Sequence, residues 1–190
     1  MLDVISGLAT GLGLSSSAGL NAYLPLLILA LAARFTDWIT LNEPWDALTS
    51  GWIIVLLAAL LAVEVVADKM PAVDHINDTI QTFIRPAAGA LLFAASSDAV
   101  ANIHPVFAMA CGVIVAGGVH AVKATARPAV TVTTAGVGNP IVSTLEDITS
   151  ALVALLSILL PTLMVLVLLL LFVLAIGWYW RRRRVRAARA

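Results

Sequence analysis

The feature that most constrains this chain is an uncharged apolar stretch of 33 residues, 148–180, which lies directly before a cluster of arginines. As one helix it would be about 50 Å long, whereas the hydrocarbon core of a bilayer is about 30 Å thick. The stretch is therefore either one tilted helix kinked at Pro161 or two membrane spans that turn there. Charged residues make up 12% of the sequence, against about 25% in soluble domains. We expect an integral membrane protein.

Earlier apolar runs predict further membrane-spanning helices, and they cover residues 4–33, 51–68, 85–103 and 105–124. With two spans from the last stretch, they predict an all-α, polytopic helical bundle of about six spans. The length allows one compact unit. Residues 1–180 are expected to form a single transmembrane bundle, and residues 181–190 a basic cytoplasmic tail.

The basic residues set the expected orientation. Six of the eleven Lys and Arg residues lie in the tail, directly after a Trp-Tyr-Trp run. Lys and Arg concentrate on the cytoplasmic side of membrane proteins, so the tail is better explained as a topology anchor than as a nucleic-acid-binding segment. Six spans then place both termini in the cytoplasm and the acidic loop 34–50 outside, whereas five would reverse the loops. Six spans also place four basic residues inside: Lys69, Arg85, Lys123 and Arg127.

Two segments have compositions that are unusual for an unbroken helix. Within residues 4–33, small and polar residues crowd together: Gly11, Gly13, Ser15, Ser16, Ser17, Gly19, Asn21 and Pro25. They indicate a broken or kinked helix. Two interpretations stay open: a small-residue face for close helix packing, and a break that lines a polar pathway. Residues 128–142, where two glycines precede Asn139-Pro140, predict a re-entrant loop or an irregular connection.

Residues 73–85 have the period of an amphipathic helix that lies at the interface or lines the bundle. Its polar face consists of Asp74, Asp78, Gln81 and Arg85. Pro86 and Pro128 each follow an arginine, and proline interrupts helical geometry, so each Arg-Pro pair is expected to mark a helix start. Because helix N-termini attract anions, Arg85 and Arg127 would suit an anionic substrate or lipid headgroup. The alternative is a pair of ordinary arginines at the cytoplasmic edge.

Two sets of opposite charges are expected at similar membrane depth. Glu64 and Asp68 lie one turn apart near the end of the second span, and His120, Lys123 and Arg127 follow one face of the fourth. A charge near the centre of a bilayer costs about 2.5–3.5 kcal/mol, which pairing offsets. The same groups would serve a proton relay or an ion path, since histidine titrates near neutral pH. The alternative is a structural ion-pair network that fixes the helix register.

Metal binding and catalysis have little support in the sequence. His75 with Asp74 and Asp78 is a weak metal site, because neither a cysteine nor a second histidine joins them. No nucleophile elbow, phosphate-binding glycine loop or zinc-protease helix occurs. We therefore expect no enzyme, no metal and no cofactor.

Three segments carry a resemblance to a known family: SAGLNAYLPLL, EVVADKMPAVDHINDTIQTFIRPAAG and GNPIVSTLEDITSALVALLSILLP. They resemble a bacterial family of small membrane proteins, domain of unknown function 4126, over residues 5–165. The resemblance implies an integral membrane protein of bacterial type and no particular activity. It marks motif positions without assigning them roles: Asn21, Glu64, Asp68, Lys69, Asp74, Asp78, Arg85, Pro86, Asn139 and Glu146.

The sequence thus favours a small transporter or channel for an ion or small solute. We expect it in the bacterial inner membrane, in contact with lipid, as a homo-oligomer and without a nucleic-acid partner. The alternatives are a structural or assembly protein and an anionic lipid-headgroup binder or translocase. The predicted polar pathway consists of Asn21, Glu64, Asp68, Lys69, Asp74, Asp78, Arg85, His120, Lys123, Arg127, Asn139 and Glu146.

Overall fold

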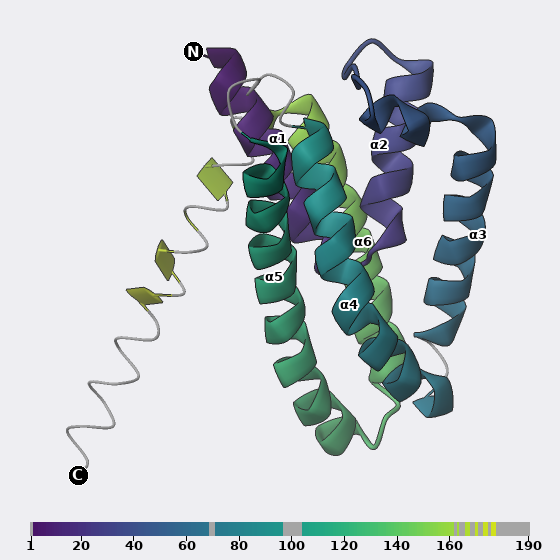
Figure 1. The fold of residues 1–190 in the computed structure, drawn as a ribbon. Helices are drawn as coiled ribbons and strands as arrows, with labels where there is room; N and C mark the ends of the chain where they lie inside the picture. The colour runs from purple at the N-terminus through teal and green to yellow at the C-terminus, as the bar shows by residue number, and fades with distance from the viewer. Residues whose placement is uncertain are drawn as a thin grey trace.

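The computed structural model describes residues 2–68, 71–96 and 104–161, with scattered positions from 163 to 177; the side chains of 2–4, 71–76 and 78 lie outside this description. Within the described part of the chain every regular element is a helix, so the predicted all-α fold is confirmed (Figure 1). The elements are α1 (Leu2–Ala18), α2 (Tyr23–Phe35), the short 3-10 helix η1 (Trp45–Thr49), α3 (Gly51–Ala67), α4 (Pro71–Ser96), α5 (Pro105–Thr134) and α6 (Asn139–Leu159).

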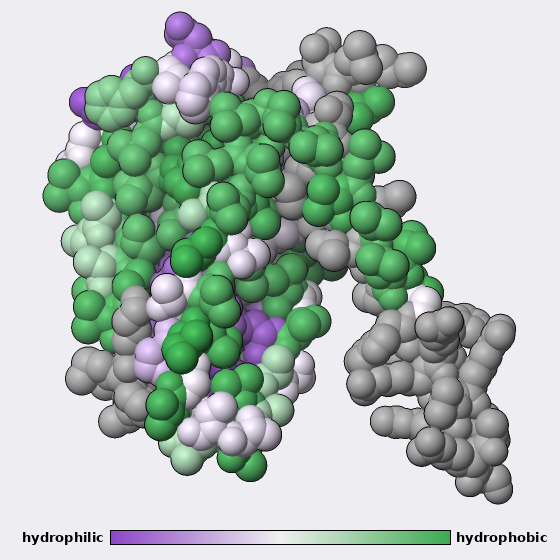
Figure 2. Space-filling model, turned by 180° about the vertical axis from the view of Figure 1, so that it is seen from behind, coloured by the Kyte–Doolittle hydropathy of each residue, from purple (hydrophilic) through white to green (hydrophobic). Residues whose placement is uncertain are grey.

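Two of the described helices, α5 and α6, are both long enough and apolar enough to cross a membrane. The apolar helices α2 and α3 are shorter, at 13 and 17 residues. Apolar side chains also cover most of the face of the molecule seen in Figure 2. Large exposed residues of this kind include Val55, Ile114, Val122 and Leu152. Monomeric soluble proteins rarely expose so much continuous apolar surface, so this exterior suits a lipid environment.

Helices α1 and α2 form a hairpin whose turn, residues 19–22, lies inside the bundle (Figure 1). Its first arm runs antiparallel to α6, because the hydroxyl of Thr10 donates to the carbonyl of Ser157 and that of Ser17 to the carbonyl of Ser150. The second arm runs back alongside α6, and its last turns line an apolar pocket together with Leu155, Ile158 and Leu159 of α6. The outer ends of both arms therefore lie at the same end of the bundle.

This hairpin corrects the prediction of a single span over residues 4–33. The predicted break is present, but the chain reverses there instead of continuing in the same direction. Gly19 permits the reversal, since a Cβ at this position would lie 2.6 Å from the carbonyl oxygen of Ala116 on α5. Hydrogen bonds to α6, contributed by Ser17, hold the first arm in place. Residues 4–33 therefore enter the bundle without spanning its length.

The two Arg-Pro pairs do not begin helices, contrary to prediction. Pro86 lies inside α4 and Pro128 inside α5. An interior proline removes one backbone hydrogen bond and commonly breaks or kinks a helix. Here both helices continue past their prolines, and the preceding arginines form ion pairs with Glu64 of α3 and with Asp68 at its C-terminal end. The predicted boundary between an amphipathic helix 73–85 and a span 85–103 is therefore absent, and residues 97–103 lie outside the described part.

The predicted irregular segment 128–142 is mostly helical. Helix α5 continues to Thr134, well beyond the predicted end of the fourth span at residue 124, and only residues 135–138 separate it from α6. Ala135 and Gly136 make the turn with positive φ angles of 50° and 83°. The N–H of Gly136 and that of Val137 donate to the carbonyls of Thr131 and Thr134, which satisfies two of the carbonyls at the end of α5. Helix α6 ends at Leu159, so 148–180 is interrupted immediately before Pro161 as the sequence suggested.

Along every long helix the buried apolar and buried charged positions are separated. The main apolar core takes Leu57 from α3, Leu92 from α4, Ala116 from α5 and Ile158 from α6, together with both arms of the hairpin. Each of these helices carries its charged interior residues nearer the end where α3 meets α4 and α5 meets α6. The bundle therefore has an apolar half, filled by the hairpin, and a charged half below the hairpin turn.

Helices α4 and α5 approach each other most closely at two glycines. A Cβ on Gly112 would lie 2.6 Å from the carbonyl carbon of Gly89 and 2.8 Å from the Cα of Ala90. Small residues permit such backbone contact between membrane helices. This close approach sets the spacing at which the charged residues of α4 and α5 face each other.

Candidate functional site

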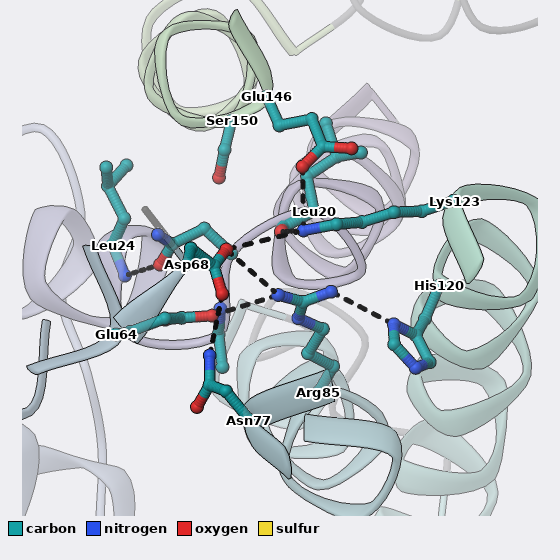
Figure 3. Close-up of polar contacts among 12 residues, drawn as sticks. Leu20, Leu24, Glu64, Asp68, Asn77, Arg85, His120, Lys123, Glu146 and Ser150 are labelled. Atoms are coloured by element: carbon teal, nitrogen blue, oxygen red, sulfur yellow. Dashed lines mark hydrogen bonds and ion pairs between the residues drawn. The ribbon is translucent and has the colours of Figure 1, made fainter. Parts of the chain in front are cut away.

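A buried network of charged side chains lies beside the hairpin turn, and Arg85 of α4 is at its centre (Figure 3). The Nη2 atom of Arg85 lies 3.2 Å from Glu64 Oε1 and 3.8 Å from Asp68 Oδ2, both from α3. Its Nη1 atom lies 3.0 Å from His120 Nδ1 on α5. A guanidinium group can only donate hydrogen bonds, so His120 Nδ1 accepts. His120 therefore carries its proton on Nε2, which lies 3.1 Å from the hydroxyl of Thr82.

Two further cations extend the network from α5 to α6. Lys123 Nζ lies 2.8 Å from Glu146 Oε2 and 3.8 Å from Asp68 Oδ2. Arg127 Nη2 lies 3.7 Å from Glu146 Oε2 and 3.6 Å from the same Asp68 oxygen. Asn77 also donates to Asp68 Oδ1 at 2.6 Å. Asp68 thus has partners on two helices, α4 and α5, and Glu146 ties α6 to the network.

The hairpin turn presents its exposed backbone groups to this network. The N–H of Ala22, at the start of α2, lies 3.4 Å from Glu64 Oε1. The carbonyl of Leu20, just beyond the end of α1, accepts a 3.0 Å bond from Lys123 Nζ. Helix N-termini favour anions and helix C-termini favour cations. The broken helix therefore places a carboxylate and an ammonium group where its own dipoles stabilise each of them.

The network is removed from the surface of the molecule. Arg85, Glu64 and Asp68 have relative exposures of 0%, 1% and 2%. Taking one ion out of water costs several kcal/mol, and a close opposite charge in a low-dielectric interior offsets this cost only where the geometry is good and further hydrogen bonds are made. Each buried charge here has at least one opposite charge within 4 Å. The charged half of the bundle is therefore held together by paired ions in place of apolar packing.

The structure brings together seven of the residues predicted for the polar pathway: Glu64, Asp68, Arg85, His120, Lys123, Arg127 and Glu146. Asn21 lies in the hairpin turn, where its amide donates to Asp147 and its carbonyl oxygen accepts from the N–H of Leu24. Asn139 lies apart, near the α5–α6 turn, and accepts from Thr131. Lys69 and the side chains of Asp74 and Asp78 lie outside the described part.

Several contributors were not predicted from the sequence. Asn77 and Asp147 bond directly to predicted residues. The four-residue spacing of Asn77, Gln81 and Arg85 on one face of α4 was the available signal for the first of these. The carbonyl of Leu20 had no signal in the sequence, because any residue type can supply a backbone carbonyl to Lys123.

Three buried oxygen atoms make neither a hydrogen bond nor an ion pair with any described residue: Glu64 Oε2, Gln81 Oε1 and Ser143 Oγ. Such atoms are rare in folded proteins, and each calls for an explanation. All three belong to residues of the charged half of the bundle. Among the described residues no group of three or more His, Cys, Asp or Glu side chains is arranged to hold a metal ion.

Residues 8–182 match the family model described as Domain of unknown function (DUF4126). The chain belongs to this family. The match covers the hairpin from residue 8 onward, helices α3 to α6 and the described charged network, so the site described above lies within the family's domain. Neither the curated proteins nor the solved structures contain a match to this chain.

Proposed function

We propose that this DUF4126 protein crosses the membrane several times and transports an ion or small solute past its buried charged network. The observation that carries the proposal is that the hairpin turn 19–22 contacts the ion-paired side chains in the interior of the bundle. Transporters commonly bind substrates and coupling ions where discontinuous helices present half-helix ends near the middle of the membrane. Ionisable residues inside membrane proteins are costly and usually functional.

The division of the bundle into two halves suggests how a pathway would open. Apolar side chains and the hairpin close one half. The other half is joined across α5 and α6 by the pairs of Lys123 and Arg127 with Glu146. Ion pairs can exchange their partners for water or a charged solute. The free-energy cost of this exchange is lower than that of separating two packed apolar surfaces. We therefore assign the gate on the side of the α5–α6 turn to these pairs.

The proposed topology has five crossings and one re-entrant hairpin. Helices α3 to α6 provide four crossings and the apolar residues 161–180 the fifth, with the arginine tail in the cytoplasm as the basic-residue bias favours. The acidic loop 36–50 is then external, as six spans also required. Because the hairpin adds no crossing, the beginning of α1 is external as well.

Labelling of single cysteines tests this topology. In a Cys111→Ala background, Ile5→Cys and Trp38→Cys are expected to react with a membrane-impermeant maleimide added to intact cells. Val137→Cys, in the α5–α6 turn, is expected to react only after the membrane is permeabilised. All three side chains are exposed. Labelling of positions 5 and 38 from opposite sides would show that residues 4–33 cross the membrane.

A structural role for the network is the second candidate. It is favoured by the charge balance among the described network residues, where Glu64, Asp68 and Glu146 face three cations. A purely structural network would lock the helices together and leave no path. Arg85 and Arg127 do not begin helices, so the observation that motivated an anionic lipid-headgroup site is absent.

Vesicle swelling distinguishes the two candidates. Purified protein in liposomes is exposed to isosmotic sodium chloride, potassium acetate or glycine, and swelling is followed by light scattering. We expect at least one solute to enter faster than into protein-free vesicles, and Glu64→Gln to slow that entry at least about tenfold, a barrier increase of about 1.4 kcal/mol. Asp46→Asn, in the exposed loop, is the control and should keep the original rate.

Thermal unfolding of the same samples completes the comparison. Transport requires that the swelling rate falls while Glu64→Gln remains folded. Equal swelling rates in the original protein and Glu64→Gln, or no solute entering above the lipid background, would contradict transport and favour the structural role.

A further inference from the structure

One buried carboxylate oxygen of the network, Glu64 Oε2, has no described partner. Glu64 Oε1 has two, the N–H of Ala22 at 3.4 Å and Arg85 Nη2 at 3.2 Å. Glu64 Oε2 has neither a hydrogen bond nor an ion pair with any described residue, although Glu64 is 1% exposed. A carboxylate oxygen has lone pairs that need partners when it is buried. Glu64 therefore keeps an acceptor available inside the bundle.

The surroundings of Glu64 select a proton over a metal cation. A bound Mg²⁺ or Ca²⁺ needs about six or more oxygen ligands, whereas the nearest groups to this carboxylate are a guanidinium and a backbone N–H. Both repel a metal ion. A proton needs a single lone pair, and on Oε2 it would leave both contacts of Oε1 in place.

Other titratable groups of the network are already committed to partners. His120 Nδ1 accepts from Arg85, so a second proton on this ring would break that contact. Asp68 uses one oxygen for Asn77 and the other for three cations. Glu146 lies 2.8 Å from Lys123. Glu64 is thus the acid whose protonation disturbs the described contacts least.

We propose that Glu64 Oε2 is a proton-binding site and that the proton is the coupling ion of this protein. The coupling role rests on the proposed function, whereas the binding of the proton does not. The proton comes from aqueous solution, adds to one lone pair of Oε2, and changes the charge of Glu64 from −1 to 0. Neutral Glu64 then attracts Arg85 and the N-terminus of α2 less strongly, which links the proton to the hairpin and to the ion pairs.

Charged and titratable groups reach this site from every helix packed around it. The turn 19–22 contributes backbone groups, and α2 contributes Tyr23, which interacts electrostatically with Glu64. The remaining groups are Asp68 of α3, Arg85 of α4, His120, Lys123 and Arg127 of α5, and Glu146 and Asp147 of α6.

Loss of the charge on Glu64 leaves Asp68 as the described carboxylate paired with Arg85, and Asp68 also pairs with Lys123 and Arg127. A negatively charged solute would then be favoured near Arg85, and we infer that the transported solute is an anion accompanied by a proton.

Infrared difference spectroscopy of the full-length protein in liposomes tests the site without requiring transport. As the pH is lowered, we expect a band from the carbonyl stretch of a buried, protonated carboxylic acid. The band should shift on ¹³C-glutamate labelling, disappear in Glu64→Gln, and persist in Glu64→Asp at a different titration midpoint. Glu43→Gln, in the exposed loop, is the control and should leave the band unchanged. A band that survives in folded Glu64→Gln, or no such band between pH 4 and pH 9, would overturn the proposal.

A second measurement separates this proposal from the proposed function. Liposomes with a trapped pH-sensitive dye are given an inward gradient of potassium acetate, with sodium chloride as the comparison. Acidification of the interior that depends on both the anion gradient and Glu64 supports coupling. Swelling without the infrared band would leave transport standing and overturn the proton site. The band with neither swelling nor Glu64-dependent acidification would leave the proton site standing and contradict transport.

Discussion

Replacing Arg85 by methionine is expected to lower the free energy of unfolding by about 3–5 kcal/mol, the usual cost of removing one partner of a buried ion pair. Arg85 is fully buried, and its guanidinium contacts Glu64, Asp68 and His120. Methionine fills similar space but leaves Glu64 with the N–H of Ala22 as its described partner. The loss should therefore come from an uncompensated charge and not from a cavity.

Equilibrium unfolding in detergent micelles, followed by circular dichroism, measures this effect. Arg34→Met is the matched control, because Arg34 is exposed and its described hydrogen bond is to the carbonyl of Thr49. We expect the control to change the free energy of unfolding by less than about 1 kcal/mol. Equal effects of the two substitutions would show that Arg85 is hydrated in the folded protein.

Replacing Gly112 by valine is expected to destabilise the protein by about 3 kcal/mol or more, the upper end of the range for overpacking. A Cβ at this position would lie 2.6 Å from the carbonyl carbon of Gly89, and backbone atoms cannot move aside as side chains can. Helices α4 and α5 would have to separate. Because these helices also carry Arg85 and His120, their 3.0 Å contact should lengthen too.

The same substitution at Gly118 provides the control for this prediction. Gly118 lies on α5, like Gly112, but a Cβ there would meet nothing within 4 Å. Gly118→Val should change the melting temperature little, since valine and glycine differ modestly in a helix. Similar melting temperatures for Gly112→Val and the unmodified protein would show that α4 and α5 lie further apart than described.

Most residues of the charged network could be predicted from the sequence, but the central position of Arg85 could not. Counting residues along two predicted helices placed Glu64 and Asp68 at a similar membrane depth to the basic residues of the fourth span, and the structure brings Asp68 to within 3.8 Å of Lys123. Arg85 was predicted at a helix start, because proline follows it. The partners of Arg85 include Glu64 on α3, by an ion pair, and His120 on α5, by a hydrogen bond, and no local sequence rule predicts either contact.

The hairpin of α1 and α2 shows a similar limit to what can be predicted from the sequence. Gly19 and Asn21 indicated a break, but the direction of the chain after a break depends on what its two arms pack against. The deciding contacts join Ser17 to Ser150, which is 133 residues further along the chain. Residues 4–33 carry no charge, so their composition suits one long span as well as two short helices. Tertiary contacts with α6 settle the choice in favour of reversal.

A double-mutant cycle between Glu64 and Arg85 tests most directly whether opposite charges on separate helices meet out of contact with water. It compares the free energies of unfolding of the original protein, Glu64→Gln, Arg85→Met and the double variant in micelles. We expect the double variant to be more stable than Arg85→Met alone, and the coupling energy to exceed about 1 kcal/mol. Additive effects of the two substitutions, with a coupling energy near zero, would contradict the buried network and the functions proposed for it.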